Sequence, residues 1–203
     1  MKTKKLIFSL LLSCICVFGV QAQSTADYEV CQGSSEDYWI ESASTGSSFS
    51  WSISPGSSGT EWSITENNND SIIVLWSSPG TYSVEVVETS ADGCDGDPVT
   101  LQVAVSELPT TADAGSNQVI CSSLDAVMAG NTALVGSGTW SQVSGPGTIT
   151  FTDATSPGTA VTASVYGTYV LRWTISNGAC AESTDDMTIK FSPKPLTNGI
   201  WHQ

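Results

Sequence analysis

The chain has 203 residues, with 20 acidic against six basic side chains and a formal net charge of −14 at pH 7. So acidic a chain is repelled by nucleic acid and by anionic lipid surfaces, which excludes both as electrostatic partners.

The first 22 residues have the pattern of a secretory signal peptide. Three lysines precede the apolar run "LIFSLLLSCICVFGV", and small residues precede a cleavage point after Ala22. A lipoprotein cut at Cys14 is the alternative, and the apolar run that continues past this residue argues against it. Cleavage of the signal peptide removes three of the six basic residues and no acidic residue, so the mature chain carries a formal net charge of −17. We expect no membrane insertion after signal removal.

Four cysteines remain after Cys14 and Cys16 leave with the signal. An even number in an exported chain indicates disulfide bonds. A structural zinc site is the alternative, but there is no Cys-x-x-Cys, and the single histidine is His202 near the end. The remaining cysteines are Cys31, Cys94, Cys121 and Cys180.

A pattern of four landmarks occurs twice along the chain. The spacings from the first Cys to Trp, from Trp to Tyr and from Tyr to the second Cys are 20, 31 and 12 residues, then 19, 29 and 11. A repeat of this length fits two small globular domains. We predict a signal at 1–22, domains at 23–105 and 114–192, a linker at 106–113, and a tail or truncated linker at 193–203.

Each repeat contains about seven short strand-like runs separated by Gly, Ser, Asn and Pro, and no run has helical periodicity. Seven strands per repeat favour an all-β fold of two tandem β-sandwiches. The predicted strands are 28–31, 38–42, 48–54, 61–65, 71–76, 81–88 and 99–105 in the first repeat, and 117–121, 126–130, 138–144, 148–152, 159–165, 168–176 and 187–191 in the second.

The recurring aromatic residues are predicted to be structural. A Trp on a middle strand and a Gly-x-Tyr at the start of a late strand are typical of immunoglobulin-like cores. We therefore expect Tyr82 and Tyr169 to pack beside Trp51 and Trp140, respectively, and to donate their hydroxyls to backbone carbonyls.

The cysteines occupy matched places in the two repeats, the first on the first strand and the second in the hairpin before the last strand. One disulfide per sandwich is therefore predicted. The expected pairs are Cys31–Cys94 and Cys121–Cys180, each stapling one end of its own sandwich.

The stretch "GTYSVEVVETSADGC" resembles the end of a PKD-like domain, although the first repeat lacks the usual Trp-Asp-Phe-Gly core. The second repeat, from "ADAGSNQVIC" to "GTYVLRWTISNGAC", is similar to repeats of Bacteroidota cell-surface proteins, including gliding-motility adhesins and cargo of the type IX secretion system. The resemblance implies that both sandwiches are immunoglobulin/PKD-like, and that they form an adhesive or spacer module in a multidomain array, with no catalytic residues. It implies as partners an extracellular glycan or surface protein and neighbouring repeats of a longer chain.

The tail "FSPKPLTNG" resembles the linker "VSELPTTADAG" after the first repeat. Either the chain is a fragment of a longer repeat protein, or it is a short stand-alone member of the family. The expected location is the cell surface or the exterior, or the periplasm if no sorting domain follows.

No enzyme is expected. There is no Gly-x-Ser-x-Gly, and His202 lies outside the predicted sandwiches. No cofactor is expected either, except calcium as a possibility. "DGCDGDP" places Asp92, Asp95 and Asp97 in one hairpin, and carboxylate oxygens suit Ca²⁺. The alternative is a solvated turn, in which Asp and Gly are common.

Two further kinds of site remain open. Trp62 and Trp76 are candidates for a sugar-stacking platform, or they fill a core that is poor in Leu and Phe. Ser71, in the sequence Asp-Ser-Ile, is a candidate glycosylation acceptor, or part of a plain turn. The predicted function is a non-catalytic adhesive or spacer module. The alternatives are a carbohydrate-binding accessory module of a secreted hydrolase and a calcium-dependent adhesion domain.

Overall fold

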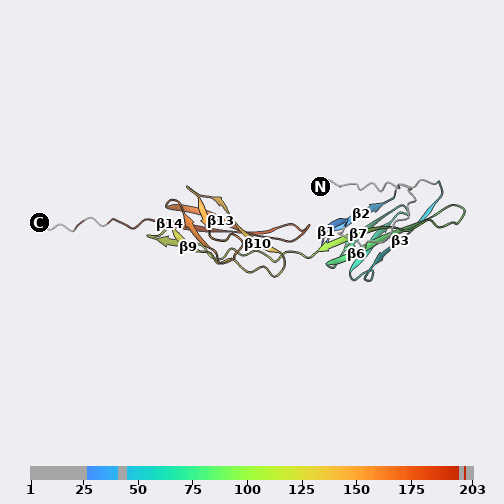
Figure 1. The fold of residues 1–203 in the computed structure, drawn as a ribbon, viewed down its shortest axis with the longest axis horizontal. Coiled ribbons are helices and arrows are strands. Elements are labelled where there is room, and N and C mark those ends of the chain that lie inside the picture. Colours follow the sequence, from blue (N-terminus) through green and yellow to red (C-terminus); the bar gives the residue numbers. More distant parts are fainter. Residues whose placement is uncertain (1–26, 41–44, 197–198, 200–203) are drawn as a thin grey trace, which may run out of the picture. The chain divides into compact units, whose positions relative to one another are not determined.

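The structure, a computed structural model, describes residues 27–40, 45–196 and 199. The predicted signal peptide and His202 lie outside these residues. All the elements of the described part are β-strands (Figure 1). No helix of this part is long and apolar enough to cross a membrane.

The first repeat folds into seven strands, as predicted. The runs 28–31, 48–54 and 71–76 are strands with the predicted bounds, while the second strand begins three residues early and ends at Trp39. Alternating apolar residues give these strands one buried face. The strands are β1 (Tyr28–Cys31), β2 (Ser35–Trp39), β3 (Ser48–Ser54), β4 (Trp62–Asn67), β5 (Ser71–Trp76), β6 (Gly80–Thr89) and β7 (Val99–Ser106).

The second repeat also folds into seven strands. Its last strand is longer than predicted, because the polar stretch at 183–186 joins the ladder opposite β13. The strands are β8 (Gln118–Cys121), β9 (Asp125–Val127), β10 (Ser137–Ser144), β11 (Ile149–Phe151), β12 (Ala160–Ala163), β13 (Gly167–Ser176) and β14 (Ser183–Ser192).

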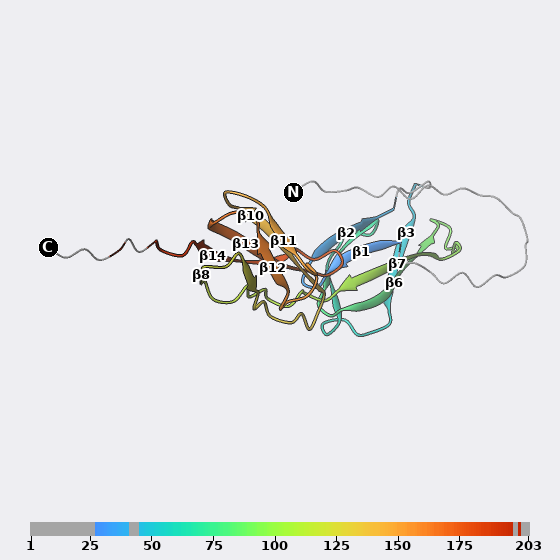
Figure 2. The same ribbon diagram turned by 60° about the vertical axis from the view of Figure 1, so that its left-hand side comes forward.

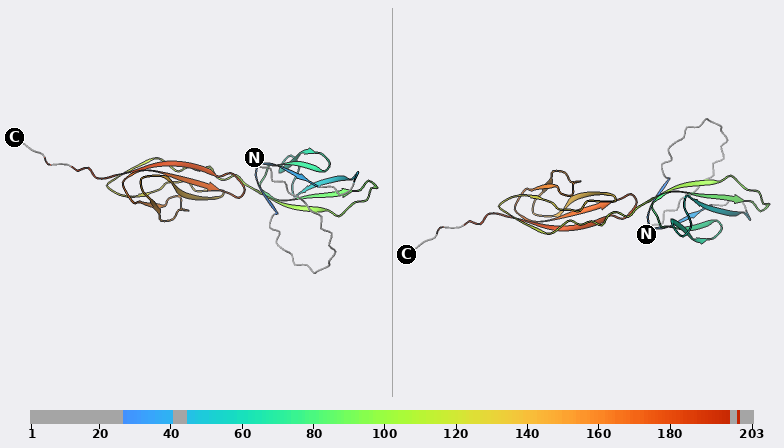
Figure 3. Two further views of the ribbon diagram at one scale, coloured as in Figure 1. Left: turned by 90° about the horizontal axis from the view of Figure 1, so that it is seen from above. Right: turned by 90° about the horizontal axis from the view of Figure 1, so that it is seen from below.

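The two repeats have the same sheet topology, strand for strand. The first pairs a sheet of order β1-β7-β6-β3 with one of order β2-β5-β4. The second pairs β8-β14-β13-β10 with β9-β12-β11, and its ribbon separates into two layers in the views of Figure 3. The first strand of each repeat lies parallel to the last, β1 to β7 and β8 to β14. The prediction of two immunoglobulin/PKD-like sandwiches is confirmed.

The register of the ladders also repeats. Trp51 pairs with Val86, four residues after Tyr82, and Trp140 pairs with Trp173, four residues after Tyr169. Figure 2 shows the central strands of each sandwich, β6 and β7 in the first and β13 and β14 in the second. The spacing of the landmarks therefore reports true structural equivalence.

The chain divides into two compact units. Unit 1 comprises Met1–Glu107 together with Gly178–Cys180, and unit 2 comprises Leu108–Asn177 and Ala181–Gln203. The three residues Gly178–Cys180 come from the turn between β13 and β14, so this turn of the second repeat packs with the first sandwich. The predicted linker and domain boundaries did not anticipate this return of the chain.

The predicted disulfide pairing is wrong. Cys31 is bonded to Cys180, while Cys94 and Cys121 are free and exposed. Cys180 meets Cys31 because its turn packs on the ends of β1 and β7, where its Sγ lies 3.4 Å from the carbonyl oxygens of Ser106 and Glu107. The expected bond within each sandwich is therefore replaced by one bond that links the two repeats.

Candidate functional site: an indole-lined hollow

The tyrosines of the repeated Gly-x-Tyr phrase are structural, as expected. Tyr82 and Tyr169 are 4% and 0% exposed. Tyr82 donates its hydroxyl to the carbonyl of Ser78 at 3.1 Å, and Tyr169 donates to that of Val165 at 2.8 Å. Both acceptors lie four residues upstream, so each bond closes the corner at which the chain enters its strand. Burial raises the pKa of Tyr82.

The ring partners of these tyrosines differ from the prediction. Tyr82 packs on Trp76, with the ring centroids 5.1 Å apart, and Tyr169 packs on Phe191 at 5.9 Å. Trp140 packs instead on Trp173 at 5.2 Å. Trp140 is buried as expected, whereas Trp51 is only half-buried at the edge of its core.

The proposed sugar platform of Trp62 and Trp76 is wrong. Trp76 is fully buried and Trp62 is 9% exposed, so neither indole presents a face to solvent. The indole N–H of Trp76 donates to the hydroxyl of Tyr38 at 3.1 Å, and that of Trp62 donates to the carbonyl of Pro55 at 3.2 Å. Burial raises the pKa of Tyr38. Both indoles are core residues with satisfied polar atoms.

Two other indoles, Trp39 and Trp51, line a hollow in the first sandwich. Trp39 is the last residue of β2, Trp51 lies in the middle of β3, and both are half-buried. The closed part of the hollow measures only about 20 Å³, and the rest of its space is open to solvent. Its other lining residues are Tyr38, Ile40, Val84, Val86, Val99, Thr100 and Leu101.

The hollow exists because the first sandwich has a smaller side chain than the second at one ladder position. Val86 stands at the ladder position that Trp173 occupies in the second sandwich, beside the equivalent Trp on the neighbouring strand. A Val side chain leaves space that an indole fills. The indole of Trp51 is also held in place, because its N–H donates to the carbonyl of Asn69 at 2.9 Å.

The hollow is therefore a shallow, apolar surface, on which a flat ligand with an apolar face would have to stack from the solvent side. The lining is apolar, and Thr100 supplies the only hydroxyl besides that of buried Tyr38. Aromatic walls with few polar groups are typical of binding pockets. Trp39 and Trp51 were not singled out as a sugar platform from the sequence. The pairing of Val86 with Trp51 is the signal that could have found them.

The candidate calcium ligands do not form a cluster. Among residues 27–40, 45–196 and 199, no group of three His, Cys, Asp or Glu side chains is placed to hold a metal ion. Asp95 accepts a hydrogen bond of 2.7 Å from the hydroxyl of Thr89, and Asp92 and Asp97 are exposed in the same hairpin. The arrangement gives no support to the calcium interpretation.

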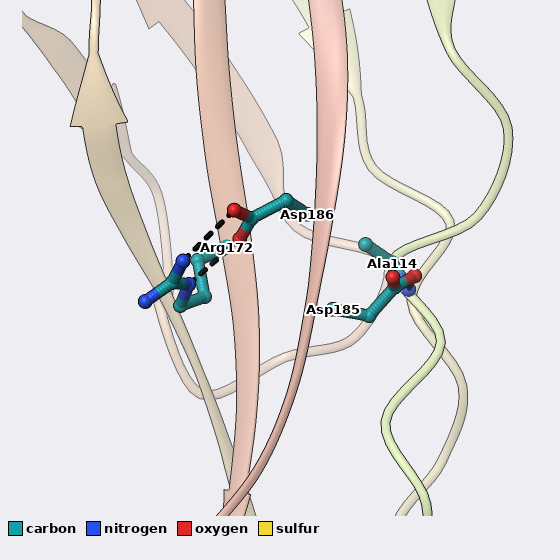
Figure 4. Close-up of polar contacts among 4 residues, drawn as sticks. All are labelled: Ala114, Arg172, Asp185 and Asp186. Carbon is teal, nitrogen blue, oxygen red and sulfur yellow. Dashed lines mark hydrogen bonds and ion pairs between the residues drawn. The ribbon is translucent and has the colours of Figure 1, made fainter.

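The acidic pair of the second repeat already has partners (Figure 4). The carboxylate of Asp186 accepts hydrogen bonds from Nε and Nη2 of Arg172 on the adjacent strand, at 2.7 and 2.8 Å. Asp185 points the other way and accepts the backbone N–H of Ala114 at 2.8 Å. The hydrogen bonds and charge of Arg172 lower the pKa of Asp186. Asp186 therefore fastens β14 to β13, and Asp185 fastens β14 to the loop that precedes β8.

Ser71 begins β5, and its hydroxyl donates to Asp70 at 3.4 Å in an exposed turn. Asn69 in this turn has a positive φ of 69° and accepts the backbone N–H of Phe49 at 3.0 Å. Its side chain is thus used to hold β3, which explains the turn without a glycan. Glycosylation of Ser71 stays a prediction.

The comparisons concern the fold. Residues 114–190 match the family model described as K319L-like, PKD domain. No curated protein matches the chain. The PKD domain from the KIAA 1837 protein is 20% identical with a TM-score of 0.39, over 44% of this chain and 92% of that one.

Two longer tandem structures are also similar. Extracellular domains 3–5 of Drosophila OTK are 14% identical with a TM-score of 0.50, over 82% of this chain and 59% of that one. The insect immune protein hemolin is 14% identical with a TM-score of 0.43, over 82% and 45%. Residues 114–190 are thus a PKD-like domain, and both repeats have the immunoglobulin-like sandwich fold.

Proposed function

We propose that the protein is a non-catalytic, exported adhesive or spacer module of a cell-surface protein, of the kind used in gliding or adhesin arrays. The observation that carries this proposal is the repetition of one sandwich with a covalent cross-link between the repeats, Cys31–Cys180. Tandem sandwiches of this type extend a chain and present surfaces. The signal-like N-terminus and the acidic composition agree with an exported protein.

The proposal is tested on cells that display the protein. Protease shaving of intact cells should release fragments of the chain, and deletion of residues 27–192 should reduce attachment of the cells. Replacement by an unrelated pair of immunoglobulin-like domains should restore attachment if the segment is a spacer, and should not if it is adhesive. A chain that stays protected inside the cell envelope, or a deletion without effect on attachment, would contradict the proposal.

A second candidate is a carbohydrate-binding accessory module, and the hollow between Trp39 and Trp51 favours it. Stacking of a sugar ring on an exposed indole face would need both residues. Glycan binding measured on an array should fall at least tenfold in Trp39→Ala and Trp51→Ala. Tyr166→Ala is the matched control, because Tyr166 is an aromatic residue 42% exposed in the other sandwich. Equal loss in all three variants would exclude the hollow as the site.

A further inference from the structure

The disulfide bond joins two points that lie far apart in the sequence. Cys31 is the last residue of β1, and Cys180 lies between β13 and β14, so the bond spans a sequence separation of 149. Every described strand except β1 and β14 lies inside the closed loop. The loop also contains most of the large buried rings of both cores, among them Trp76, Tyr82, Tyr169 and Trp173.

The contacts around the bond show that Cys180 packs closely against the end of β7. Cys180 is 7% exposed, and its Sγ touches the carbonyls at the end of β7. Gly178 in the same turn has a φ of +51°, and a Cβ at this position would run into the hydroxyl of Ser106. Only Gly combines this backbone conformation with so close an approach. Within this turn the side chain of Cys180 is thus buried at the end of the strand pair, while Gly178 and Ala179 are exposed.

Tension applied to the two ends of a cross-linked chain follows the shortest covalent path. Here the path enters along β1, crosses the sulfur atoms of Cys31 and Cys180, and leaves along β14. The backbone from Gln32 to Ala179 is not part of this path. It cannot be drawn out while the bond is intact.

The two strands on the path can carry tension with little change in length. A β-strand rises about 3.3 Å per residue, and a fully extended chain reaches about 3.6 Å per residue. The described residues outside the loop, 27–30 and 181–196, supply at most about 70 Å of extended chain at ~3.5 Å per residue. The closed loop, with its separation of 149, would release about 520 Å on the same basis.

We infer that the Cys31–Cys180 bond is a tension bypass, which keeps pulling force off the backbone between Gln32 and Ala179 and leaves only β1 and β14 to carry it. The inference deepens the proposed spacer role and rests on it for the source of the tension. The test below needs only the chain itself. If the attachment experiment failed, the result of the stretching experiment would be unaffected.

The experiment is single-molecule stretching of the mature chain with handles attached at residues 27 and 196, after non-reducing peptide mapping. The oxidised chain should show no extension step beyond ~70 Å. Cys31→Ser, or reductant added to the oxidised wild type under constant force, should release about 520 Å more in one or two steps. The reductant arm keeps the test valid if the variant does not fold.

Cys121→Ser is the matched control. Cys121 pairs with Ser192 in the parallel ladder, as Cys31 pairs with Ser106, but it is free and exposed. Cys121→Ser should therefore give the same short extension as the oxidised wild type. A thiol reagent should modify Cys94 and Cys121 and leave Cys31 and Cys180 untouched. Steps of several hundred ångströms in the oxidised wild type, or a mapped Cys31–Cys94 peptide, would overturn the inference.

Discussion

The two sandwiches have the same strand order and register, but they bury most of their large rings on opposite sheets. In the first, three of the four buried rings, Tyr38, Trp62 and Trp76, come from the three-stranded sheet β2-β5-β4, and only Tyr82 comes from the four-stranded sheet. In the second, the four-stranded sheet β10-β13-β14-β8 supplies the rings, namely Trp140, Tyr169, Trp173 and Phe191. The topology thus tolerates either distribution, provided that the space between the sheets is filled.

The different placement of the large rings is accompanied by size changes at neighbouring positions. In the second sandwich Gly138, two residues before Trp140, makes room for the ring of Trp173. In the first, Phe49 stands two residues before Trp51, and Val86 replaces the large ring. The compensation is incomplete, because the hollow remains beside Trp51. The first core is therefore less completely packed at this end than the second.

The largest difference between the cores is expected from removing the paired indoles. Trp173 is fully buried, so Trp173→Ala should destabilise the second sandwich by about 3–5 kcal/mol, the usual range for a buried aromatic residue. Trp51→Ala should cost the first sandwich less, since half of its ring environment is already open. Hydrogen exchange followed by mass spectrometry measures each sandwich separately. Equal losses at the two sites would refute the contrast in packing.

Much of this fold could be predicted from the sequence, because local patterns determine it. Alternation located β3 and β5 with their true bounds, and the spacing of Gly-x-Tyr identified Tyr82 and Tyr169 as equivalent corner residues. These features depend on residues that are close in the chain. Their physical causes are strand pleating and the tight corner that precedes each strand.

The disulfide and the candidate site could not be predicted in this way. Four cysteines allow three pairings, and matched spacing favoured the two local ones. The true pair depends on the turn at Cys180 packing with the first unit, which no local pattern encodes. The burial of Trp76 and the half-buried position of Trp39 likewise depend on which sheet carries most of the large rings, and this differs between the two repeats.

A glycine substitution tests the compensation directly. The Cβ of Gly138→Ala would overlap the six-membered ring of Trp173, so we expect a loss of about 1–3 kcal/mol from overpacking in the second sandwich. Combining it with Trp173→Val, which copies the first sandwich, should cost less than the sum of the two single changes. Urea unfolding of the four proteins measures this coupling. Additive losses would show that the two residues do not share one space.

The corner tyrosines should respond alike, because the comparison places them in the same role. Tyr82→Phe and Tyr169→Phe each remove one hydrogen bond to a backbone carbonyl and keep the ring, so each should cost roughly 0.5–1.5 kcal/mol. Thermal unfolding together with an attachment assay measures both stability and function. Full stability with lost attachment in Tyr82→Phe would make that residue a recognition group and end the equivalence.

The smallest effect is expected from the ion pair of Arg172 and Asp186, which has no counterpart at the equivalent ladder position of the first sandwich. The residue equivalent to Arg172 is Glu85, and it faces Thr100 across the ladder. The pair is about 40% exposed on both sides, and solvent screening weakens such contacts. Removing it should therefore change the unfolding midpoint less than any substitution above.

The contribution of this ion pair to stability is small, but its dependence on pH makes it measurable. Because Arg172 lowers the pKa of Asp186 in the folded chain, the pair stabilises the second sandwich fully above the carboxyl's unfolded pKa of about 4. The stabilisation is lost as the pH falls through the lower, folded pKa. Asp186→Asn should thus be less stable than wild type at pH 7, and the difference should vanish near pH 2. Glu85→Gln should show no such convergence, because its ladder partner is uncharged. A difference for Asp186→Asn that persists at pH 2 would mean that the side chain acts by packing rather than by charge.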